Sequence, residues 1–248
     1  MNKWIACICL MGFVSVSMAA PAKGSFKDDR DGKTYKTIKL GKQTWMAENL
    51  NLHMDDSWCY ERKTENCKKY GRLYTWKKAE KACPVGWHLP SRSEWRDLVS
   101  YVSENSKSKP GNTLRTKDDW KVKKKKKKIY DQHTGEAIYL DEYEVINNGT
   151  DELGFSVLPA GYVSKEGRSD KLKERALFWS SSKEKGKKTK KAYARMLEFG
   201  DESIHENKYS TDNAFSVRCV KVSRRFRRPS PRPIRQMPPL HQTSRIEA

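Results

Sequence analysis

Four cysteines in the body of the chain are the residues best suited to covalent chemistry. Thiols can form disulfides, bind a metal ion or act in redox catalysis. An even number of cysteines in an exported chain favours two disulfides, and four cysteines allow three pairings. We favour one pair that closes a short polar loop and one that joins a helix end to the last strand, namely Cys59–Cys67 and Cys83–Cys219.

Zinc binding is the alternative use of these thiols. The spacings Cys59-x7-Cys67 and Cys67-x15-Cys83 lack the close CxxC pair of structural zinc sites, and no histidine lies nearby at ligand spacing. Asp29-x-Asp31-Gly32 resembles the start of a calcium loop, but the later ligands are missing, so a turn is the better interpretation. We expect neither a metal nor a cofactor.

The sequence offers no catalytic set. The five histidines are scattered, and there is no Ser/His/Asp combination, phosphate-binding loop or paired-carboxylate motif. Tryptophans could stack on sugar rings, but Trp76 and Trp95 fall on apolar helix faces and are expected in the core. For Trp58 and Trp120 both burial in the core and exposure to a ligand remain open. Trp58 lies in a loop, and Trp120 lies beside the lysine run.

The N-terminus has the pattern of a secretory signal peptide. Lys3 precedes an apolar run from Trp4 to Val14, and small residues follow. This predicts a signal peptide over residues 1–19, with a cut as late as residue 22, and a mature chain in the periplasm, on the cell surface or secreted. An uncleaved anchor is the alternative, although the run is shorter than the about 20 residues that a membrane span needs. Cys7 and Cys9 would leave with the signal.

Positive charge is concentrated in two segments. The net charge is +20, and an unbroken lysine run and an arginine- and proline-rich tail over 224–248 carry more than half of it. Basic patches bind polyanions, so polysaccharide or another cell-surface polyanion is a possible partner; a solvated charge run without a specific ligand is the alternative. The candidate residues are Lys123, Lys124, Lys125, Lys126, Lys127, Lys128, Arg224, Arg225, Arg227 and Arg228.

Local patterns predict the elements that position these residues. Residues 34–48 read as a β-hairpin that turns at Gly41-Lys42, and residues 71–82 as a helix. Ser91 and Glu94 form a capping box in front of a helix of about 12 residues that ends near Ser103. Residues 104–150 are irregular. The lysine run should form a solvated loop or a hairpin extension, because neighbouring like charges repel, and the acidic segment after it could pair with it.

The chain from residue 153 onward is rich in β-forming residues, with a turn at Gly200-Asp201. In the last strand Phe215, Val217 and Cys219 alternate with Ser216, Arg218 and Val220, which predicts one buried face. We therefore expect a domain over 26–223 with a basic insertion over 117–148, followed by a disordered tail over 224–248.

Several segments of the chain, in order, resemble one family. They are DGKTYKTIKLGKQTWMAENLN (31–51), the WCY and NCKKYGRLYTW segments within 58–76, CPVGWHLPSRSEW (83–95), GTDELGFSVLPAGY (149–162), FWSSS (178–182) and AFSVRCVK (214–221). Together they resemble the Fibrobacter succinogenes major paralogous (FISUMP) domain, whose members are mostly exported or surface-attached. The resemblance implies little about biochemical activity.

A more distant resemblance concerns the fold. WHLPSRSEW is similar to a segment of formylglycine-generating enzymes, whose fold is related to C-type lectin-like domains. This implies an α+β domain with two helices on irregular, mostly antiparallel sheets. Formylglycine-type oxidation needs unpaired late cysteines, whereas here only Cys219 is late. The sequence therefore favours a non-enzymatic binding or surface module over polyanion attachment and over an oxidoreductase.

Overall fold

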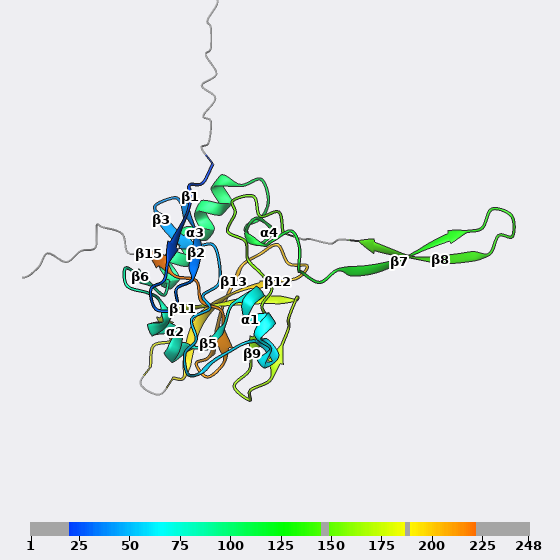
Figure 1. Ribbon diagram of the computed structural model, residues 1–248. Helices are drawn as coiled ribbons and strands as arrows, with labels where there is room; N and C mark the ends of the chain where they lie inside the picture. Colours follow the sequence, from blue (N-terminus) through cyan, green and yellow to red (C-terminus); the bar gives the residue numbers. More distant parts are fainter. Residues whose placement is uncertain (1–19, 145–148, 187–188, 222–248) are drawn as a thin grey trace, which may run out of the picture.

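The computed structural model describes residues 20–144, 149–186 and 189–221. Short helices pack against antiparallel sheets, so the predicted α+β class is confirmed (Figure 1). The predicted signal peptide (1–19) and tail (224–248) lie outside the described residues. The described helices are a 3₁₀ helix η1 (Tyr60–Arg62), α1 (Thr64–Tyr70), α2 (Trp76–Ala82), α3 (Arg92–Asn105) and α4 (Pro110–Leu114).

The first sheet has the strand order β1-β2-β3-β15-β6. The alternation along β2 buries Tyr35, Ile38 and Leu40 and exposes Lys36 and Lys39, although Thr37 is buried as well. The predicted hairpin is confirmed, with Gly41 at a φ of +58° in its turn. The strands are β1 (Lys23–Lys27), β2 (Thr34–Leu40), β3 (Gln43–Met46), β15 (Val220–Lys221) and β6 (Trp87–His88).

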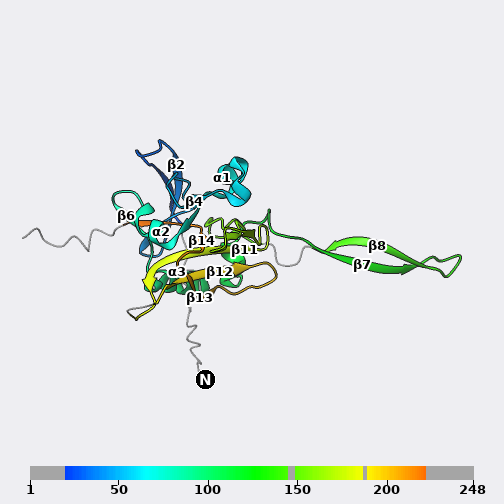
Figure 2. The same ribbon diagram turned by 90° about the horizontal axis from the view of Figure 1, so that it is seen from below.

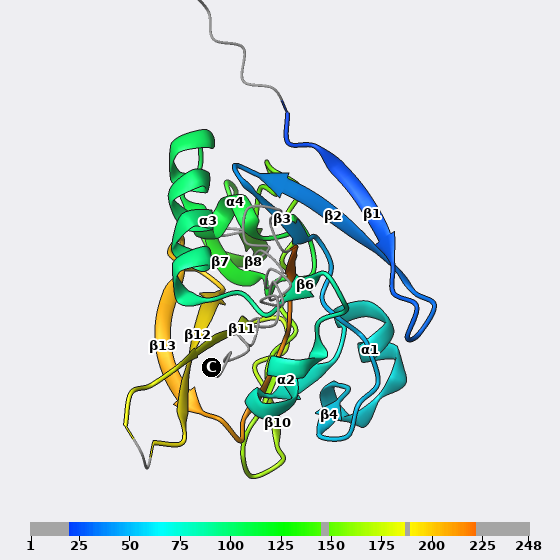
Figure 3. The same ribbon diagram turned by 90° about the vertical axis from the view of Figure 1, so that its left-hand side faces the viewer.

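Two further sheets complete the body. One has the order β10-β9-β14-β5-β4 and the other the order β11-β12-β13, with Gly200 in the predicted turn between β12 and β13. Figure 3 shows α3 and β13 along one side of the molecule and β1, β2 and α1 along the other. The strands are β4 (Ser57–Trp58), β5 (Leu73–Thr75), β9 (Tyr162–Val163), β10 (Ser169–Asp170), β11 (Arg175–Lys183), β12 (Lys191–Glu198), β13 (His205–Ser210) and β14 (Ala214–Phe215).

The observed helices match the helices predicted from the sequence only where the local sequence signals are strong. The capping box is present: the Ser91 Oγ accepts from the Glu94 amide, and the Glu94 carboxylate accepts from the Ser91 amide. The helix predicted over 71–82 begins only at Trp76, because residues 73–75 pair with β14 and β4. Helices α1 and α4 lie in segments that were expected to be loops.

The segment 214–221 does not form the single strand that was predicted for it. Only its ends are strands, since β14 belongs to the second sheet and β15 to the first. The residues between them cross the interior from one sheet to the other. Ser216 and Arg218, which alternate with the residues of the single buried face that was predicted, are therefore buried as well, with exposed fractions of 0% and 1%.

Aromatic side chains fill the core on both sides of this segment. Trp45 and Trp95 pack with ring centroids 4.7 Å apart, and Trp179 stacks on Phe215 at 4.2 Å. Trp76 and Trp95 are buried as expected. Trp120, left open by the sequence, is also buried, while Trp58 is half-buried at the edge of a smaller cluster.

Two long strands form an arm that projects from the body (Figures 1 and 2). Strand β7 (Lys123–Tyr130) carries the lysine run and pairs antiparallel with β8 (Ala137–Glu144) over eight residue pairs. The expected pairing of the lysines with the acidic segment is therefore confirmed. Within 117–148, the described part of the chain thus holds a regular hairpin, one of the two forms expected for the lysine run.

Candidate functional site

Two disulfides lie close to the candidate site. The structure joins Cys59 to Cys67 and Cys83 to Cys219, the pairing favoured from the sequence. The long-range bridge connects the residue that ends α2 to the residue that precedes β15. Every cysteine in the described part of the chain is thus in a disulfide, so no thiol there is available for formylglycine-type oxidation.

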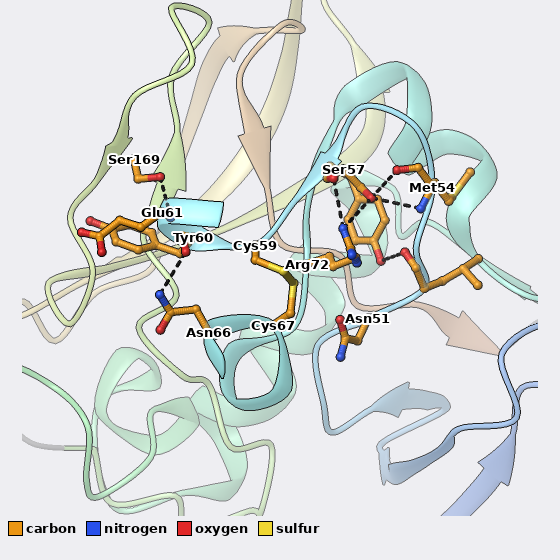
Figure 4. Close-up of a disulfide and its surroundings, with 12 residues drawn as sticks. Asn51, Met54, Ser57, Cys59, Tyr60, Glu61, Asn66, Cys67, Arg72 and Ser169 are labelled. Atoms are coloured by element: carbon orange, nitrogen blue, oxygen red, sulfur yellow. Dashed lines mark hydrogen bonds between the residues drawn. A yellow bond between two sulfur atoms is a disulfide. The ribbon is translucent and has the colours of Figure 1, made fainter. Parts of the chain in front are cut away.

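The short bridge holds α1 against a strained turn (Figure 4). Glu61 and Arg62 have φ values of +52° and +58°, a region that residues with side chains rarely adopt. The Glu61 amide donates to Ser169 Oγ at 2.8 Å, and the Asn66 side chain donates to the Tyr60 carbonyl at 3.0 Å. These bonds and the disulfide compensate for an unfavourable backbone and fix where α1 begins.

A groove of about 760 Å³ lies between β1–β2 and α1. Both elements stand on the same side of the molecule (Figures 2 and 3). Gly71 forms part of its wall directly after α1, with a φ of +77°. A Cβ at this position would lie 2.7 Å from Asn49 Cβ, so only glycine lets the chain leave α1 so close to the segment after β3.

The groove is basic. Glu48 and Asp151 are the two carboxylates that line it, and both are engaged: Glu48 accepts from the Lys36 amide at 2.7 Å, and Asp151 from Ser156. The cationic residues that line it are Lys23, Lys33, Lys36, Lys68, Lys69 and Arg218.

Two of these lysines are not neutralised by neighbours. Lys23 and Lys68 are exposed, and no carboxylate among the described residues lies within ion-pair distance of either. Lys69 differs, because its hydrogen bond with Asp119 raises the pKa of the ammonium group. The groove therefore presents two uncompensated ammonium groups, one from β1 and one from α1.

Arg218 also lines the groove but is almost wholly buried. Its guanidinium donates to Asn49 Oδ1 and to the carbonyls of Phe155 and Ser156, all of them neutral acceptors. The Phe155 ring lies 4.6 Å from the guanidinium carbon. Burial lowers the pKa of Arg218 to about 9, since no carboxylate is bonded to it. Its charge adds to the positive potential of the groove.

The groove is built from residues that are far apart in the sequence, and most of them lie within the range of one family model. The family model of the Fibrobacter succinogenes major domain matches residues 38–221, about three quarters of the chain. The chain belongs to this family. A search of the curated proteins and a search of the solved structures each found no match.

Some residues that line the groove lie within the part of the chain that matches the Fibrobacter succinogenes major domain, and others precede it. Lys68, Lys69 and Arg218 lie within the matched residues, whereas Lys23 and the turn before β2 precede them. The arm lies inside the matched range. The N-terminal hairpin of this chain thus supplies one wall of a groove whose other wall belongs to the family domain.

The residues predicted to bind polyanions do not line this groove. Lys123–Lys128 form β7 on the arm, and Arg224, Arg225, Arg227 and Arg228 lie outside the described residues. Within the described ranges, no cluster of His, Cys, Asp or Glu could hold a metal ion, and no helix is long and apolar enough to cross a membrane.

Sequence reasoning missed the groove residues. Lys23, Lys68 and Arg218 come from three separate segments. Lys68 and Arg218 stand in segments that resemble the family, but no spacing relates the three residues to one another. One local signal existed for Arg218: it stands among strongly apolar neighbours next to a disulfide cysteine. Trp58 lines a second cleft of about 530 Å³ with Arg62 and Arg168, which was likewise not expected.

Proposed function

We propose that this protein is an exported, non-enzymatic binding module that holds an anionic component of the cell surface in the groove between β1–β2 and α1. The observation that carries the proposal is the pair of uncompensated lysines, Lys23 and Lys68, on opposite walls of that groove. An acidic sugar of a polysaccharide has the matching chemistry, since its carboxylate can accept from an ammonium group.

Export is supported by two features. The first 19 residues have the composition of a signal peptide. Two disulfides are typical of proteins that fold in an oxidising compartment. We place the mature chain in the periplasm, on the cell surface or outside the cell.

A C-type-lectin-like or sulfatase-modifying-factor-like fold is part of the proposal. It is supported by the capped helix α3, by the small irregular sheets, and by the disulfide that brings α2 close to the C-terminal strand. The fold itself does not specify a ligand. The ligand class therefore rests on the groove alone.

The groove can be tested with trigalacturonate, a short acidic oligosaccharide. The variant Lys23→Gln/Lys68→Gln should bind it about tenfold more weakly than the unchanged protein in isothermal titration calorimetry. The control is Lys77→Gln/Lys81→Gln, which removes the same charge from exposed positions of α2 outside the groove. A neutral sugar trimer should not bind measurably.

Two results would contradict the proposal. One is an equal loss of affinity from the groove variant and the α2 variant, which would mean that only net charge matters. The other is no detectable binding of trigalacturonate at low ionic strength, where screening of charges is weakest.

A further inference from the structure

The arm formed by β7 and β8 has two faces of different chemistry. Residues directly opposite each other in an antiparallel pair lie on the same face, and successive residues alternate between faces. The register pairs Lys128 with Tyr139 and Lys125 with Glu142. The residues of the two faces follow from this register.

One face, here named the Lys–Tyr face, consists of Lys124, Lys126, Lys128, Tyr130, Ala137, Tyr139, Asp141 and Tyr143. The other, the Lys–Glu face, consists of Lys123, Lys125, Lys127, Ile129, Ile138, Leu140, Glu142 and Glu144. Each face has three lysines. The Lys–Glu face places two glutamates directly opposite lysines, whereas the Lys–Tyr face has one aspartate and three tyrosines.

Side chains near the tip of the arm agree with this division. The Lys128 Nζ lies 5.1 Å from the Tyr130 ring centroid and 6.0 Å from that of Tyr139, so the three side chains share a face. Tyr130 is 63% exposed and Tyr139 62% exposed. Aromatic rings beside ammonium groups are thus open to solvent.

The arm lies apart from the hydrophobic core. Figures 1 and 2 show it extending from the body in both views. An isolated two-stranded hairpin is marginally stable in water unless another surface covers one of its faces. Large exposed aromatic side chains on such an element are typical of an interaction surface.

We propose that the Lys–Tyr face binds acidic polysaccharide. This inference rests on the proposed function and gives the same class of ligand a second contact outside the groove. Residues two positions apart along a strand are separated by about 7 Å, so this face places positively charged residues at a regular spacing that suits an extended polyanion. The exposed tyrosine rings offer apolar faces for sugar rings and hydroxyls for hydrogen bonds.

Charge complementarity selects this face over the other. The register places two glutamates opposite lysines on the Lys–Glu face and one aspartate opposite a lysine on the Lys–Tyr face, so the Lys–Tyr face has the larger excess of positively charged residues. A single-stranded nucleic acid could also use lysines and aromatic rings. The proposed location outside the cytoplasm favours the polysaccharide, and the experiment below separates the two.

The test compares two variants with the same change in charge. The Lys–Tyr variant is Lys124→Gln/Lys126→Gln/Lys128→Gln, and its control is Lys123→Gln/Lys125→Gln/Lys127→Gln. The first should weaken binding of the full-length protein to long-chain polygalacturonate by about tenfold, and the second by less than about threefold. The dependence of affinity on salt should become shallower chiefly in the first variant.

The tyrosines have their own matched pair. Tyr130→Ala/Tyr139→Ala should weaken polygalacturonate binding about fivefold, while Ile129→Ala/Ile138→Ala on the opposite face should leave it unchanged. Thermal unfolding of each variant, followed by near-ultraviolet circular dichroism, checks that the body is intact.

The outcomes separate the arm from the groove. Equal effects of the two lysine triples, or a larger effect of the Lys–Glu triple, would overturn the proposal. Tighter binding of a single-stranded oligonucleotide than of polygalacturonate at equal charge concentration would overturn the ligand class. If Lys23→Gln/Lys68→Gln abolishes trigalacturonate binding while both arm triples bind polygalacturonate as well as the unchanged protein, the arm proposal fails and the groove proposal stands.

Discussion

Cys83 and Cys219 lie 136 positions apart in the sequence and are joined by a disulfide in the structure. The bridge ties the end of α2 to the segment that crosses between the two five-stranded sheets. It encloses most of the domain, including the arm. Its counterpart, Cys59–Cys67, closes a loop of eight positions that contains η1 and the first turn of α1.

Removing the two bridges should have unequal effects. In the chain-entropy model, the long loop stabilises the fold by about 5 kcal/mol and the short loop by about 2–3 kcal/mol. We expect Cys83→Ala/Cys219→Ala to lower the free energy of unfolding in urea more than Cys59→Ala/Cys67→Ala does. A larger loss from the short bridge would show that the turn at Glu61 and Arg62 matters more than loop closure.

The same disulfides predict a measurable mass. Reduction and alkylation should reveal four thiols in the mature chain, and the intact mass without reductant should be lower by about four hydrogens. Detection of a reactive free thiol in the unreduced, folded protein would contradict the assignment and return formylglycine-type oxidation to consideration. Cleavage of the signal peptide is read from the same spectrum.

Arg218 should be among the most sensitive positions in the domain. Arg218→Met keeps much of the apolar contact but leaves the Phe155 and Ser156 carbonyls without a donor. We expect a loss of about 3 kcal/mol or more in the free energy of unfolding. The control, Arg168→Met on the surface, should change stability by less than about 0.5 kcal/mol. Equal losses would mean that the buried contacts contribute little.

Gly71 should tolerate no side chain. Gly71→Ala places a methyl group against Asn49 and the Leu50 carbonyl at a positive φ, and we expect a loss of more than about 2 kcal/mol. Gly32→Ala is the matched control: its φ is +69°, but nothing lies within 4 Å of the added Cβ, so about 1 kcal/mol is expected. If chemical denaturation shows similar losses of unfolding free energy for Gly71→Ala and Gly32→Ala, the positive φ alone accounts for both losses.

Acid should weaken the turn between β1 and β2. Hydrogen bonds from the Arg30 side chain hold the pKa of Asp28 below its ordinary value, and the same guanidinium donates to the Ala82 carbonyl at 2.8 Å. The folded pKa lies below the unfolded one, so this stabilisation is present at neutral pH and is lost as the pH falls below about 4.

The measurement is the free energy of unfolding between pH 6 and pH 2. Asp28→Asn should be less stable than the unchanged protein at pH 6, and the difference should shrink towards pH 2. Asp29→Asn, which removes the exposed neighbouring carboxylate, controls for the change in net charge. A difference between Asp28→Asn and the unchanged protein that does not vary with pH would contradict the role given to ionised Asp28.

Local patterns in the sequence were enough for the elements that depend on neighbouring residues. The Ser91–Glu94 capping box, the turn at Gly41 and the pairing of the lysine run with the acidic segment all connect residues that are close in the chain. The start of α2 was wrong because residues 73–75 pair with β14, which lies about 140 positions later. Tertiary pairing outweighed helix periodicity there.

The candidate site could not be predicted in the same way. The groove needs Lys23 from β1, Lys68 from α1 and the buried guanidinium of Arg218 in one place. No spacing relates these three residues, because each belongs to a different element. Alternation predicted only one buried face in the last strand, whereas the crossing between two sheets buries Arg218 along with it.

The sequence by itself determined the family, the cysteine set and the concentration of positive charge, because these follow from residue types and short motifs. Only the tertiary structure decided that scattered lysines meet across a groove and that Arg218 is buried between two sheets. The physical reason is that the wall of a groove and the interior between sheets are defined by packing between segments that are distant in the chain.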